Sequence, residues 1–371
     1  MENIAVDRIQ PSLFSLFGMR YICTALRNKP MQSFSWLPEV NRLYGFQITE
    51  NKIRPFGDGH IHQTFLIDWE DKKFILQRFN HQVFQFPERI SHNHDILIRE
   101  IDPEKLPFIL PLPIPNMHGE LFSVIDGQYF RLAPFVEGKC VNEVDYPHQA
   151  YLAAKAFAQF IVAGIHIKAS LLQESIPNFH DLQLRYQQLL QSVSSTQRQV
   201  KGELKELVDF YLDQKKLVEE YALWKSKLPL RMTHSDTKIN NLIYADDFSK
   251  VNAVIDLDTI MAGYVFYDFG DLVRTVACTE GESSQNWENI KVDMPKYAAL
   301  LKGFQEVGEG AFTKEEIQSL PYGGQMMTCI MGFRFLADYL NGNVYYTIHY
   351  EEQNLHRAKN QMFLLKALQR I

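Results

Sequence analysis

Residues 233–244 read Thr-His-Ser-Asp-Thr-Lys-Ile-Asn-Asn-Leu-Ile-Tyr, and residues 251–258 read Val-Asn-Ala-Val-Ile-Asp-Leu-Asp. The first stretch is a polar loop that runs into an apolar segment, and the second is an apolar segment that ends in acids. We predict a loop followed by a hairpin whose second strand holds Asp256 at its end. Asp236 and Asn241 lie in the loop, close enough in sequence for one hairpin to bring the three side chains together.

This set of side chains suits phosphoryl transfer. The reaction needs a carboxylate that orients the attacking hydroxyl and accepts its proton, and oxygen ligands that hold Mg²⁺ against the nucleotide phosphates. We predict Asp236 as the base and Asn241 and Asp256 as metal ligands, which implies ATP and Mg²⁺ as cofactors. Lys238, just after the base, can offset the charge on the transferred phosphoryl group. Asp258 is either a second metal ligand or a turn cap.

A small β-rich unit is predicted upstream of the loop. Its expected elements are a glycine-bearing turn, strands at 64–69 and 73–79, a helix from 87 to about 99, and strands at 121–125 and 129–132. In the turn, Gly57 and Gly59 either cover the phosphates of a nucleotide or serve only to allow positive φ. We predict that residues 134–138 form the hinge between this unit and the rest of the chain. Because Pro134 has no N–H, we expect Phe135 to donate to the adenine.

Long helices dominate the chain after this hinge. Apolar residues recur at the spacing of a buried helical face, which predicts helices at 151–168, 181–194, 203–225, 295–306, 314–340 and 351–370. The loop and hairpin form an irregular insert between these helices. We therefore expect an α+β protein with an extension of unknown role (1–40), a nucleotide-binding lobe (41–133), a hinge (134–138) and a helical lobe (139–371).

Composition excludes several classes of protein. The 371 residues include 38 Lys and Arg against 44 Asp and Glu, a formal net charge of −6, so no overall basic field is available to hold nucleic acid. The four cysteines lie far apart without a Cys-x-x-Cys pair, which argues against a disulfide framework or a thiolate metal site. No apolar run reaches the ~18 residues of a membrane span. We expect a cytoplasmic protein without a nucleic-acid, membrane or protein partner.

The loop and hairpin resemble the kinase-like superfamily of small-molecule phosphotransferases, which contains aminoglycoside and choline kinases. Further stretches resemble its N-acetylhexosamine 1-kinase branch: Phe-Gly-Asp-Gly-His-Ile (56–61), Ile-Leu-Gln (75–77), Tyr-Asp-Phe-Gly-Asp (267–271) and Gly-Phe-Arg-Phe-Leu-Ala-Asp-Tyr-Leu (332–340). They follow one another in consistent order over roughly residues 40–370. The resemblance implies a bilobal protein-kinase-like fold, with a small antiparallel β lobe and a larger, mainly helical lobe.

The resemblance also implies an activity, the ATP- and Mg²⁺-dependent phosphorylation of the anomeric hydroxyl of an N-acetylhexosamine (GlcNAc or GalNAc). It implies that Asp236 faces this hydroxyl and that His60, Arg334 and Tyr345 contact the sugar. At position 62 the family more often has Asn, whereas this chain has His62. The alternatives are another acceptor, such as an aminoglycoside, choline or homoserine, or a protein that binds nucleotide or sugar without catalysis.

One position departs from the pattern of protein kinases, whose third small-lobe strand carries a lysine for the α- and β-phosphates. The matching residue is Gln77, which we assign to the nucleotide site, as the resembling sugar kinases also have Gln there. The adjacent Arg78 should point to the opposite face of the strand. Either the chain is a pseudokinase or another cation replaces the lysine, and Lys238 favours the second interpretation.

Structural roles compete with functional ones at several positions. We interpret His234 as a residue that holds the loop rather than one that reacts. Asp268 and Asp271 belong to a stretch that looks like the metal-binding Asp-Phe-Gly of protein kinases, but we interpret them as carboxylates that meet free N–H groups at a helix start. Without the resemblance, Arg334 and Asp338 would be interpreted as an exposed ion pair on one helix face.

Overall fold

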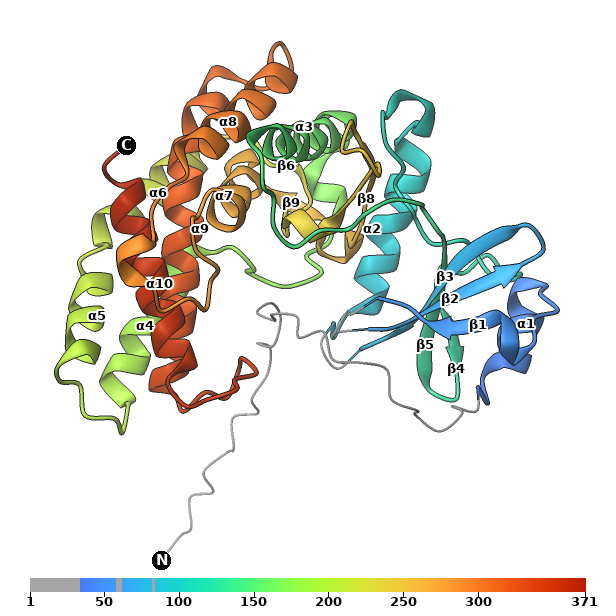
Figure 1. Ribbon diagram of the computed structural model, residues 1–371, viewed down its shortest axis with the longest axis horizontal. Helices are drawn as coiled ribbons and strands as arrows, with labels where there is room; N and C mark the ends of the chain where they lie inside the picture. The colour runs from blue at the N-terminus through green and yellow to red at the C-terminus, as the bar shows by residue number, and fades with distance from the viewer. Residues whose placement is uncertain (1–33, 58–61, 82–83) are drawn as a thin grey trace, which may run out of the picture.

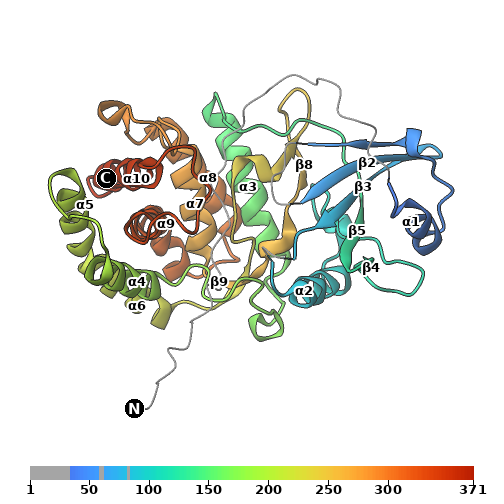
Figure 2. The same cartoon turned by 90° about the horizontal axis from the view of Figure 1, so that it is seen from below.

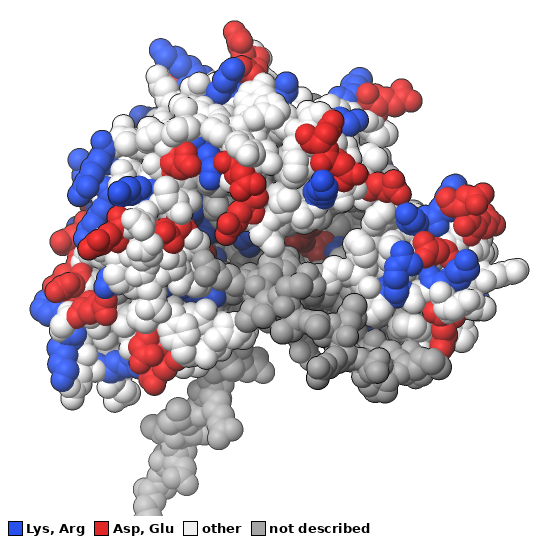
Figure 3. Space-filling model, in the orientation of Figure 1, with Lys and Arg blue, Asp and Glu red and all other residues white. Residues whose placement is uncertain are grey.

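The computed structural model describes residues 34–57, 62–81 and 84–371, which form a small sheet lobe and a larger helical lobe (Figure 1). The predicted α+β class, with an antiparallel sheet and a larger helical portion, is confirmed. Lys and Arg are interspersed with Asp and Glu over the face shown in Figure 3. No helix in the described part of the chain combines the length and the apolar character needed to cross a bilayer.

The sheet has five antiparallel strands in the order β1-β2-β3-β5-β4. Their bounds are β1 (Ile53–Pro55), β2 (Gln63–Trp69), β3 (Lys72–Phe79), β4 (Ser123–Ile125) and β5 (Gln128–Pro134). The β2–β3 pair confirms the predicted hairpin. Because side chains alternate along a strand, the paired residues Gln77 and Arg131 share one face of the sheet. Leu76 and Leu132 share the other face, where they are buried.

Helix α1 (Leu37–Tyr44) packs its apolar side on the sheet (Figure 1). Leu37 and Val40 are buried in the same cluster as the apolar residues of β2 and β3. Residues 34–40 therefore belong to the sheet lobe, and the boundary predicted at residue 41 is too late in the chain. Residues 1–33, the rest of the predicted extension, lie outside the described part.

Helix α2 (Pro87–Glu100) follows the strand β3 in sequence and lies between the sheet and the helical lobe in Figure 1. Its Ile96 and Leu97 join the core of the helical lobe. Asn93 donates through Nδ2 to the backbone oxygens of Gln173 and Ile260, both 2.8 Å away. The helix therefore connects the two lobes at their junction.

The helical lobe is built from α3 (Pro147–Ala163), α4 (Leu182–Ser195), α5 (Glu203–Leu212), α6 (Lys215–Lys227), α7 (Val265–Val276), α8 (Met294–Gly308), α9 (Lys314–Leu340) and α10 (Gln353–Leu368). The prediction of one helix over 203–225 is wrong, because the helix is interrupted at Asp213 and Gln214. Helix α5 packs on α10 and α9, whereas α6 packs on α4 and α9. The helix predicted over 151–168 ends early, at Gly164.

The insert between α6 and α7 forms two small sheets. Strand β6 (Arg231–Thr233) pairs with β9 (Met261–Gly263), and β7 (Leu242–Tyr244) pairs with β8 (Val251–Val254), which confirms the predicted hairpin. The 3-10 turns η4 (Ile239–Asn241) and η5 (Leu257–Thr259) lie beside these strands. The polar loop with Asp236 begins after β6 and ends at β7, so both of its ends are fixed.

Helices α7 and α9 lie side by side (Figure 2) and meet at glycines. A Cβ on Gly270 of α7 would stand 2.1 Å from the backbone oxygen of Gly323. A Cβ on Gly323 of α9 would stand 2.2 Å from the backbone oxygen of Phe266. Because both contacts are with packed backbone, neither can be relieved by a side-chain movement. The spacing of the two helices therefore depends on these glycines.

We predict that Gly323→Ala destabilises the protein by about 2 kcal/mol through overpacking, although alanine favours a helix by about 1 kcal/mol over glycine. Gly324→Ala is the matched control, because its Cβ would meet only the side chain of Val273, at 2.9 Å. Urea denaturation of both variants measures the effect. A Gly323→Ala protein as stable as Gly324→Ala would contradict the interpretation of the helix contact.

Candidate active site

The polar loop places three of the predicted residues side by side. Asp236 is 4% exposed, and its Oδ1 lies 2.9 Å from Lys238 Nζ. Its Oδ2 accepts a hydrogen bond of 3.0 Å from Asn241 Nδ2. No described residue donates to the Oδ1 of Asn241, so this oxygen remains available to a cation. The loop thus holds one carboxylate between a cation and an amide.

The loop and the end of β8 are held together through backbone atoms. His234 Nε2 donates to the Ile255 oxygen at 2.9 Å, and the Ile255 N–H donates to the Asn241 oxygen, also at 2.9 Å. Two residues beside these contacts have left-handed backbones, with φ of +64° at Ser235 and +58° at Asp256. Such conformations cost about 1–3 kcal/mol for residues other than glycine and persist where the surroundings impose them. His234 therefore acts on the loop as a holding residue, the role expected from the sequence.

Asp256 makes no hydrogen bond or ion pair with a described residue, although it lies beside two other acids. Burial, followed by the charges of Asp258 and Asp236, raises the pKa of Asp256 to about 6. A cation next to Asp256 would relieve this concentration of negative charge. Together with Asn241 Oδ1, the site offers two oxygen ligands.

This donor set fits Mg²⁺. The described residues contain no group of three or more His, Cys, Asp or Glu side chains that would hold a metal ion by themselves. Proteins usually bind Mg²⁺ through one or two carboxylates together with the phosphates of a substrate, because the ion keeps an octahedral shell and gives up water reluctantly. Asp256 and Asn241 match that mode of binding.

Asp268 accepts hydrogen bonds from the polar loop rather than from its own helix, α7. Its carboxylate accepts hydrogen bonds from the backbone N–H groups of His234 and Ser235, both at 2.8 Å. Thr237 Oγ1 donates to the Asp268 backbone oxygen at 2.6 Å. Burial raises the pKa of Asp268 to about 6, although both N–H bonds favour the charged form. Asp268 thus lies in the first turn of α7, as expected, but the N–H groups that it meets belong to the polar loop, which it anchors.

Asp271 also has a different role from the expected one. It forms an ion pair with Arg274, with Nη2 2.8 Å from Oδ1, and Arg274 in turn contacts Glu282 at 2.7 Å. Burial would raise the pKa of Asp271, but the Arg274 guanidinium outweighs it and lowers that pKa. Asp271 therefore stabilises the α7 region as part of a buried ion network.

Asp258 makes a contact that was not expected from the sequence. Both of its oxygens accept hydrogen bonds from Arg131 of β5, with Nη2 2.8 Å from Oδ2. His62 Nε2 lies 3.0 Å from the same Oδ2. Burial would raise the pKa of Asp258, but Arg131 and His62 hold it well below its usual range. Arg131 is not among the residues predicted from the sequence, because only the pairing of β3 with β5 reveals it.

The nucleotide-side residues predicted on the sheet have clear partners. Gln77 Oε1 accepts from Arg131 Nε at 2.8 Å, so Gln77 faces the lobe junction. Arg78 points to the other face, as predicted, and donates to Gln128 at 3.1 Å. Gly57 has a φ of +71°, and a Cβ placed there would meet no atom of the described residues within 4 Å, so conformation rather than contact with them favours glycine. The other glycine of this turn, Gly59, lies outside the described residues.

The hinge offers a different N–H from the expected one. The Phe135 N–H donates to the Lys73 backbone oxygen at 3.2 Å, whereas no described residue accepts from the Val136 N–H. The ring of Phe56, next to the glycine turn, packs edge-on against the Phe135 ring at a centroid distance of 5.6 Å. The Val136 N–H is therefore the better-placed donor in the predicted hinge, with two aromatic rings nearby.

Arg334 and Tyr345 meet in the helical lobe. Arg334 Nη2 donates to Tyr345 Oη at 2.6 Å, and the Arg334 side chain is almost buried, with 8% exposed. The exposed pair of Arg334 with Asp338 does not form, because Asp338 accepts the backbone N–H groups of Tyr345 and Tyr346 at 2.8 and 3.0 Å. Asp338 thus shapes the connection that presents Tyr345 to Arg334.

Two residues connect Arg334 to the polar loop. The Arg334 guanidinium carbon lies 5.6 Å from the centre of the Phe179 ring, which contacts the ring of the next residue, His180. His180 Nε2 donates to the Ser235 oxygen at 2.8 Å. These contacts link Arg334, and through it Tyr345, to the residue before Asp236, whereas His60 lies outside the described residues.

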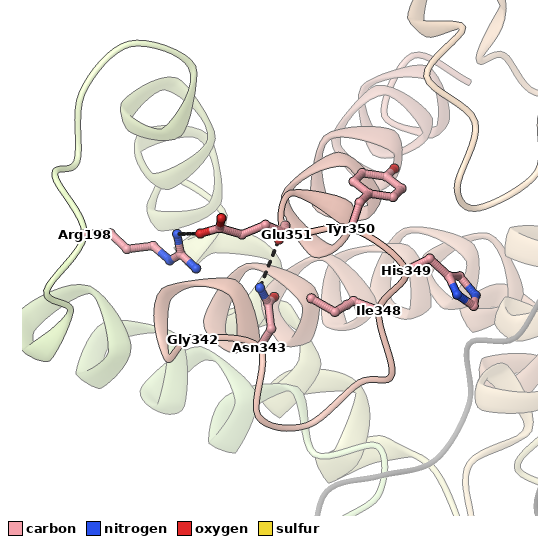
Figure 4. Close-up of a pocket in the computed structure, with 7 residues that line it drawn as sticks. All are labelled: Arg198, Gly342, Asn343, Ile348, His349, Tyr350 and Glu351. Carbon is pink, nitrogen blue, oxygen red and sulfur yellow. Dashed lines mark hydrogen bonds and ion pairs between the residues drawn. The ribbon is translucent and has the colours of Figure 1, made fainter.

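A separate surface pocket of about 440 Å³ lies on the connection between α9 and α10 (Figure 4). It is lined by Arg198, Gly342, Asn343, Ile348, His349, Tyr350 and Glu351. An ion pair of 3.1 Å between Arg198 and Glu351 and a hydrogen bond of 2.9 Å from Asn343 to the Glu351 oxygen cross it. None of the predicted site residues lines this pocket, so we do not assign it to the active site.

Comparisons with known proteins agree with this geometry at the level of a family. A profile of the phosphotransferase enzyme family matches residues 52–294. A homoserine kinase of Agrobacterium fabrum is 22% identical over 214 residues, which make up 57% of this chain and 58% of that kinase. The match thus spans a little more than half the length of that relative.

Solved structures share the fold. An aminoglycoside phosphotransferase from Alicyclobacillus acidocaldarius has a TM-score of 0.58 at 14% identity, covering 86% of this chain and 92% of that one. A spectinomycin phosphotransferase in complex with ADP and spectinomycin has a TM-score of 0.54 at 13% identity, covering 92% of this chain and 100% of that one. The bilobal fold expected from the sequence resemblance is confirmed.

We predict that Asp268→Asn lowers kcat about a hundredfold, because misplacing the predicted base Asp236 by about 1 Å would cost that much. The amide keeps the shape but turns an NH₂ toward one of the two backbone N–H groups, which should cost about 2 kcal/mol of stability. Asp293→Asn makes the same change at the N-cap of α8, where Asp293 accepts from Lys296 at 3.0 Å. An Asp268→Asn enzyme that loses stability but keeps its kcat, as Asp293→Asn should, would argue against the anchoring role.

Proposed function

Because the chain belongs to the phosphotransferase enzyme family, we propose that it transfers the γ-phosphoryl group of ATP to the anomeric hydroxyl of an N-acetylhexosamine, GlcNAc or GalNAc. The products are the sugar 1-phosphate and ADP. One observation carries the phosphoryl-transfer step, whereas the sugar acceptor rests on the sequence resemblance. Asp256 makes no hydrogen bond or ion pair with a described residue, and it is close enough to interact with the charge of Asp236, which is held by Lys238 and Asn241. Metal-dependent phosphoryl transfer needs this pairing of a positioned base with an uncompensated carboxylate.

On the nucleotide side, Asp256 and Asn241 would hold Mg²⁺ when the nucleotide is bound. When bound, the ion neutralises part of the charge that the phosphates carry. The Phe56 and Phe135 rings pack beside the adenine, and the Val136 N–H donates to it. This assignment replaces the Phe135 N–H, which already has the Lys73 oxygen as an acceptor.

The glycine turn and the sheet complete the nucleotide side. Gly57 and Gly59 bring the turn close to the phosphates, because a backbone without Cβ atoms approaches a ligand closely. Gln77 lines the phosphate end of the cleft through its contact with Arg131. Lys238 supplies a cation in place of the missing strand lysine, which supports an active enzyme over a pseudokinase.

On the acceptor side, Asp236 accepts the proton of the attacking hydroxyl and aligns its oxygen with the γ-phosphorus. The new bond joins the sugar oxygen to phosphorus as the bond from phosphorus to the ADP oxygen breaks. Lys238, 2.9 Å from the Asp236 carboxylate, contacts the transferred group and offsets its charge. Arg334, Tyr345 and His60 donate hydrogen bonds to the sugar.

A second candidate acceptor is a small hydroxy acid such as homoserine. Arg334 has no carboxylate partner among the described residues, and its buried Nε has no hydrogen-bond acceptor there. A buried guanidinium commonly binds a carboxylate through two parallel hydrogen bonds. The homoserine kinase to which the chain is similar acts on an acceptor of that kind.

The charge near Arg334 argues against cationic acceptors. An aminoglycoside or choline needs acids or an open aromatic cage. The Arg334 guanidinium already lies over the rings of Phe179, Tyr345 and Tyr346, at 5.6, 5.6 and 5.7 Å. A second cation would meet repulsion at the same rings.

The test is ³¹P NMR of the protein with Mg-ATP and, one at a time, GlcNAc, GalNAc, homoserine, choline and an aminoglycoside. We expect a product phosphorus coupled to the anomeric proton of an N-acetylhexosamine. A phosphomonoester on homoserine with no sugar product would replace the first acceptor by the second. ATP left unchanged with every acceptor, despite nucleotide binding, would support a non-catalytic binding protein.

We further predict that Asp236→Asn lowers kcat about a thousandfold, because the amide cannot accept the hydroxyl proton. Binding of Mg-ATP should remain close to normal, since Asp256 and Asn241 are intact. Asp246→Asn is the control, an exposed aspartate in the turn of the same hairpin. Steady-state kinetics and nucleotide titration measure the two effects, and a mutant with undiminished turnover would disprove the assignment of the base.

A further inference from the structure

Neither partner of the usual small-lobe ion pair is present in the described part of this chain. In protein kinases, the lysine of the third strand pairs with a glutamate of the helix beside the sheet. Here the strand position is Gln77, and the buried face of α2 presents the neutral residues Asn93 and His94. His94 Nε2 lies 3.1 Å from the Leu257 backbone oxygen. Helix α2 thus contacts the 257–260 segment directly, through neutral groups.

Arg131 supplies the missing cation from the neighbouring strand. It lies opposite Gln77 in the β3–β5 pair and is 6% exposed. Its Nε donates to Gln77 at 2.8 Å, and both terminal nitrogens donate to the carboxylate of Asp258 in the helical lobe. The fork-to-fork geometry fixes distance and orientation together. Arg131, the cation of the small lobe, therefore pairs with Asp258 of the helical lobe rather than with a residue of helix α2.

His62 completes the set of donors around Asp258. The backbone N–H of Asn80 donates to His62 Nδ1 at 3.0 Å, so the ring proton resides on Nε2. Nε2 then donates to Asp258 Oδ2 at 3.0 Å from a neutral ring. The His62 ring also stacks on Phe79 and Phe84, at 4.6 and 5.6 Å. Where the resembling sugar kinases more often have Asn, this chain thus has a residue that reaches across to the helical lobe.

The position of Asp258 makes this contact relevant to the metal site. Asp258 is 1% exposed and lies two residues after Asp256, within the turn that gives Asp256 its left-handed backbone. All three side-chain nitrogens of Arg131 already donate to protein acceptors, so its role is to hold this turn rather than to bind phosphate. Phe79 and Phe122 flank its guanidinium at 5.3 and 5.8 Å.

We infer that Arg131 is a positioning residue that replaces the lysine–glutamate pair of protein kinases. It binds Asp258 across the lobe junction, and Gln77 and His62 support this contact. The contact holds Asp256 in place for Mg²⁺ and keeps the lobes closed. The inference rests on the proposed nucleotide and metal site but not on the identity of the acceptor. Groups that orient a metal ligand commonly change metal affinity by about 10–100-fold when they are removed.

The experiment measures binding of a fluorescent ADP analogue to the full chain at increasing Mg²⁺, which needs no acceptor. We expect Arg131→Met and Asp258→Asn each to raise the half-saturating Mg²⁺ concentration by about tenfold or more. The double variant should be no worse than the more affected single variant, because both changes remove the same contact. Arg131→Lys, which keeps the charge but loses the fork, should recover part of the effect.

Arg78→Met is the matched control, since Arg78 is the neighbour of Gln77 on the opposite face of the same strand, and it should leave the Mg²⁺ dependence unchanged. Small-angle X-ray scattering adds a readout without ligand: the radius of gyration should increase in Arg131→Met but not in Arg78→Met. If Arg131→Met does not fold, the same measurements on the double variant, Arg131→Met with Asp258→Asn, test the inference, because that variant leaves no buried unpaired charge.

An Arg131→Met protein, or a double variant, with wild-type Mg²⁺ dependence would overturn the inference. The inference would also be overturned if the fold-increases in half-saturating Mg²⁺ concentration of the two single variants multiplied in the double variant. A wild-type chain that binds no nucleotide at any Mg²⁺ concentration would instead overturn the proposed nucleotide site, whereas normal wild-type binding with no change in the variants refutes only the role of Arg131.

Discussion

The burial of acids at the junction of the two lobes is the constraint on which the site depends. A carboxylate removed from water must find donors or a cation, or it will be protonated. Asp236 has a lysine and an amide, Asp258 has an arginine from the sheet, Asp268 has two backbone N–H groups, and Asp271 has an arginine of its own helix. Asp256 has no such partner among the described residues. The arrangement therefore singles out one carboxylate for an external cation.

The donors for these acids also assemble the fold. Asp268 fixes the start of the polar loop to α7, and α7 keeps its distance from α9 through Gly270 and Gly323. Asp258 fixes the end of the hairpin to the sheet through Arg131. The two anchors hold opposite ends of one short segment from different sides. Local strain at Asp256 can persist because neither end of that segment is free to relax.

Contacts between residues that are close along the chain could be predicted from the sequence. The β2–β3 hairpin and the grouping of Asp236, Lys238 and Asn241 follow from local patterns that need no knowledge of the fold. Arg131 and Asp258 are 127 residues apart, and their contact depends on which strands pair and on how the lobes meet. The break between α5 and α6 has a similar cause, since packing against different helices overrides a continuous helical pattern. Such tertiary choices leave no local signal.

The same contact limits how the lobes can move. Opening the lobes about the predicted hinge (134–138) would separate Arg131 from Asp258 and break the two hydrogen bonds that join the guanidinium to the carboxylate. Helix α2 adds resistance, because its Asn93 is bound to the helical lobe at two backbone oxygens. A large opening of the lobes during each turnover is therefore unfavourable in free energy in this chain.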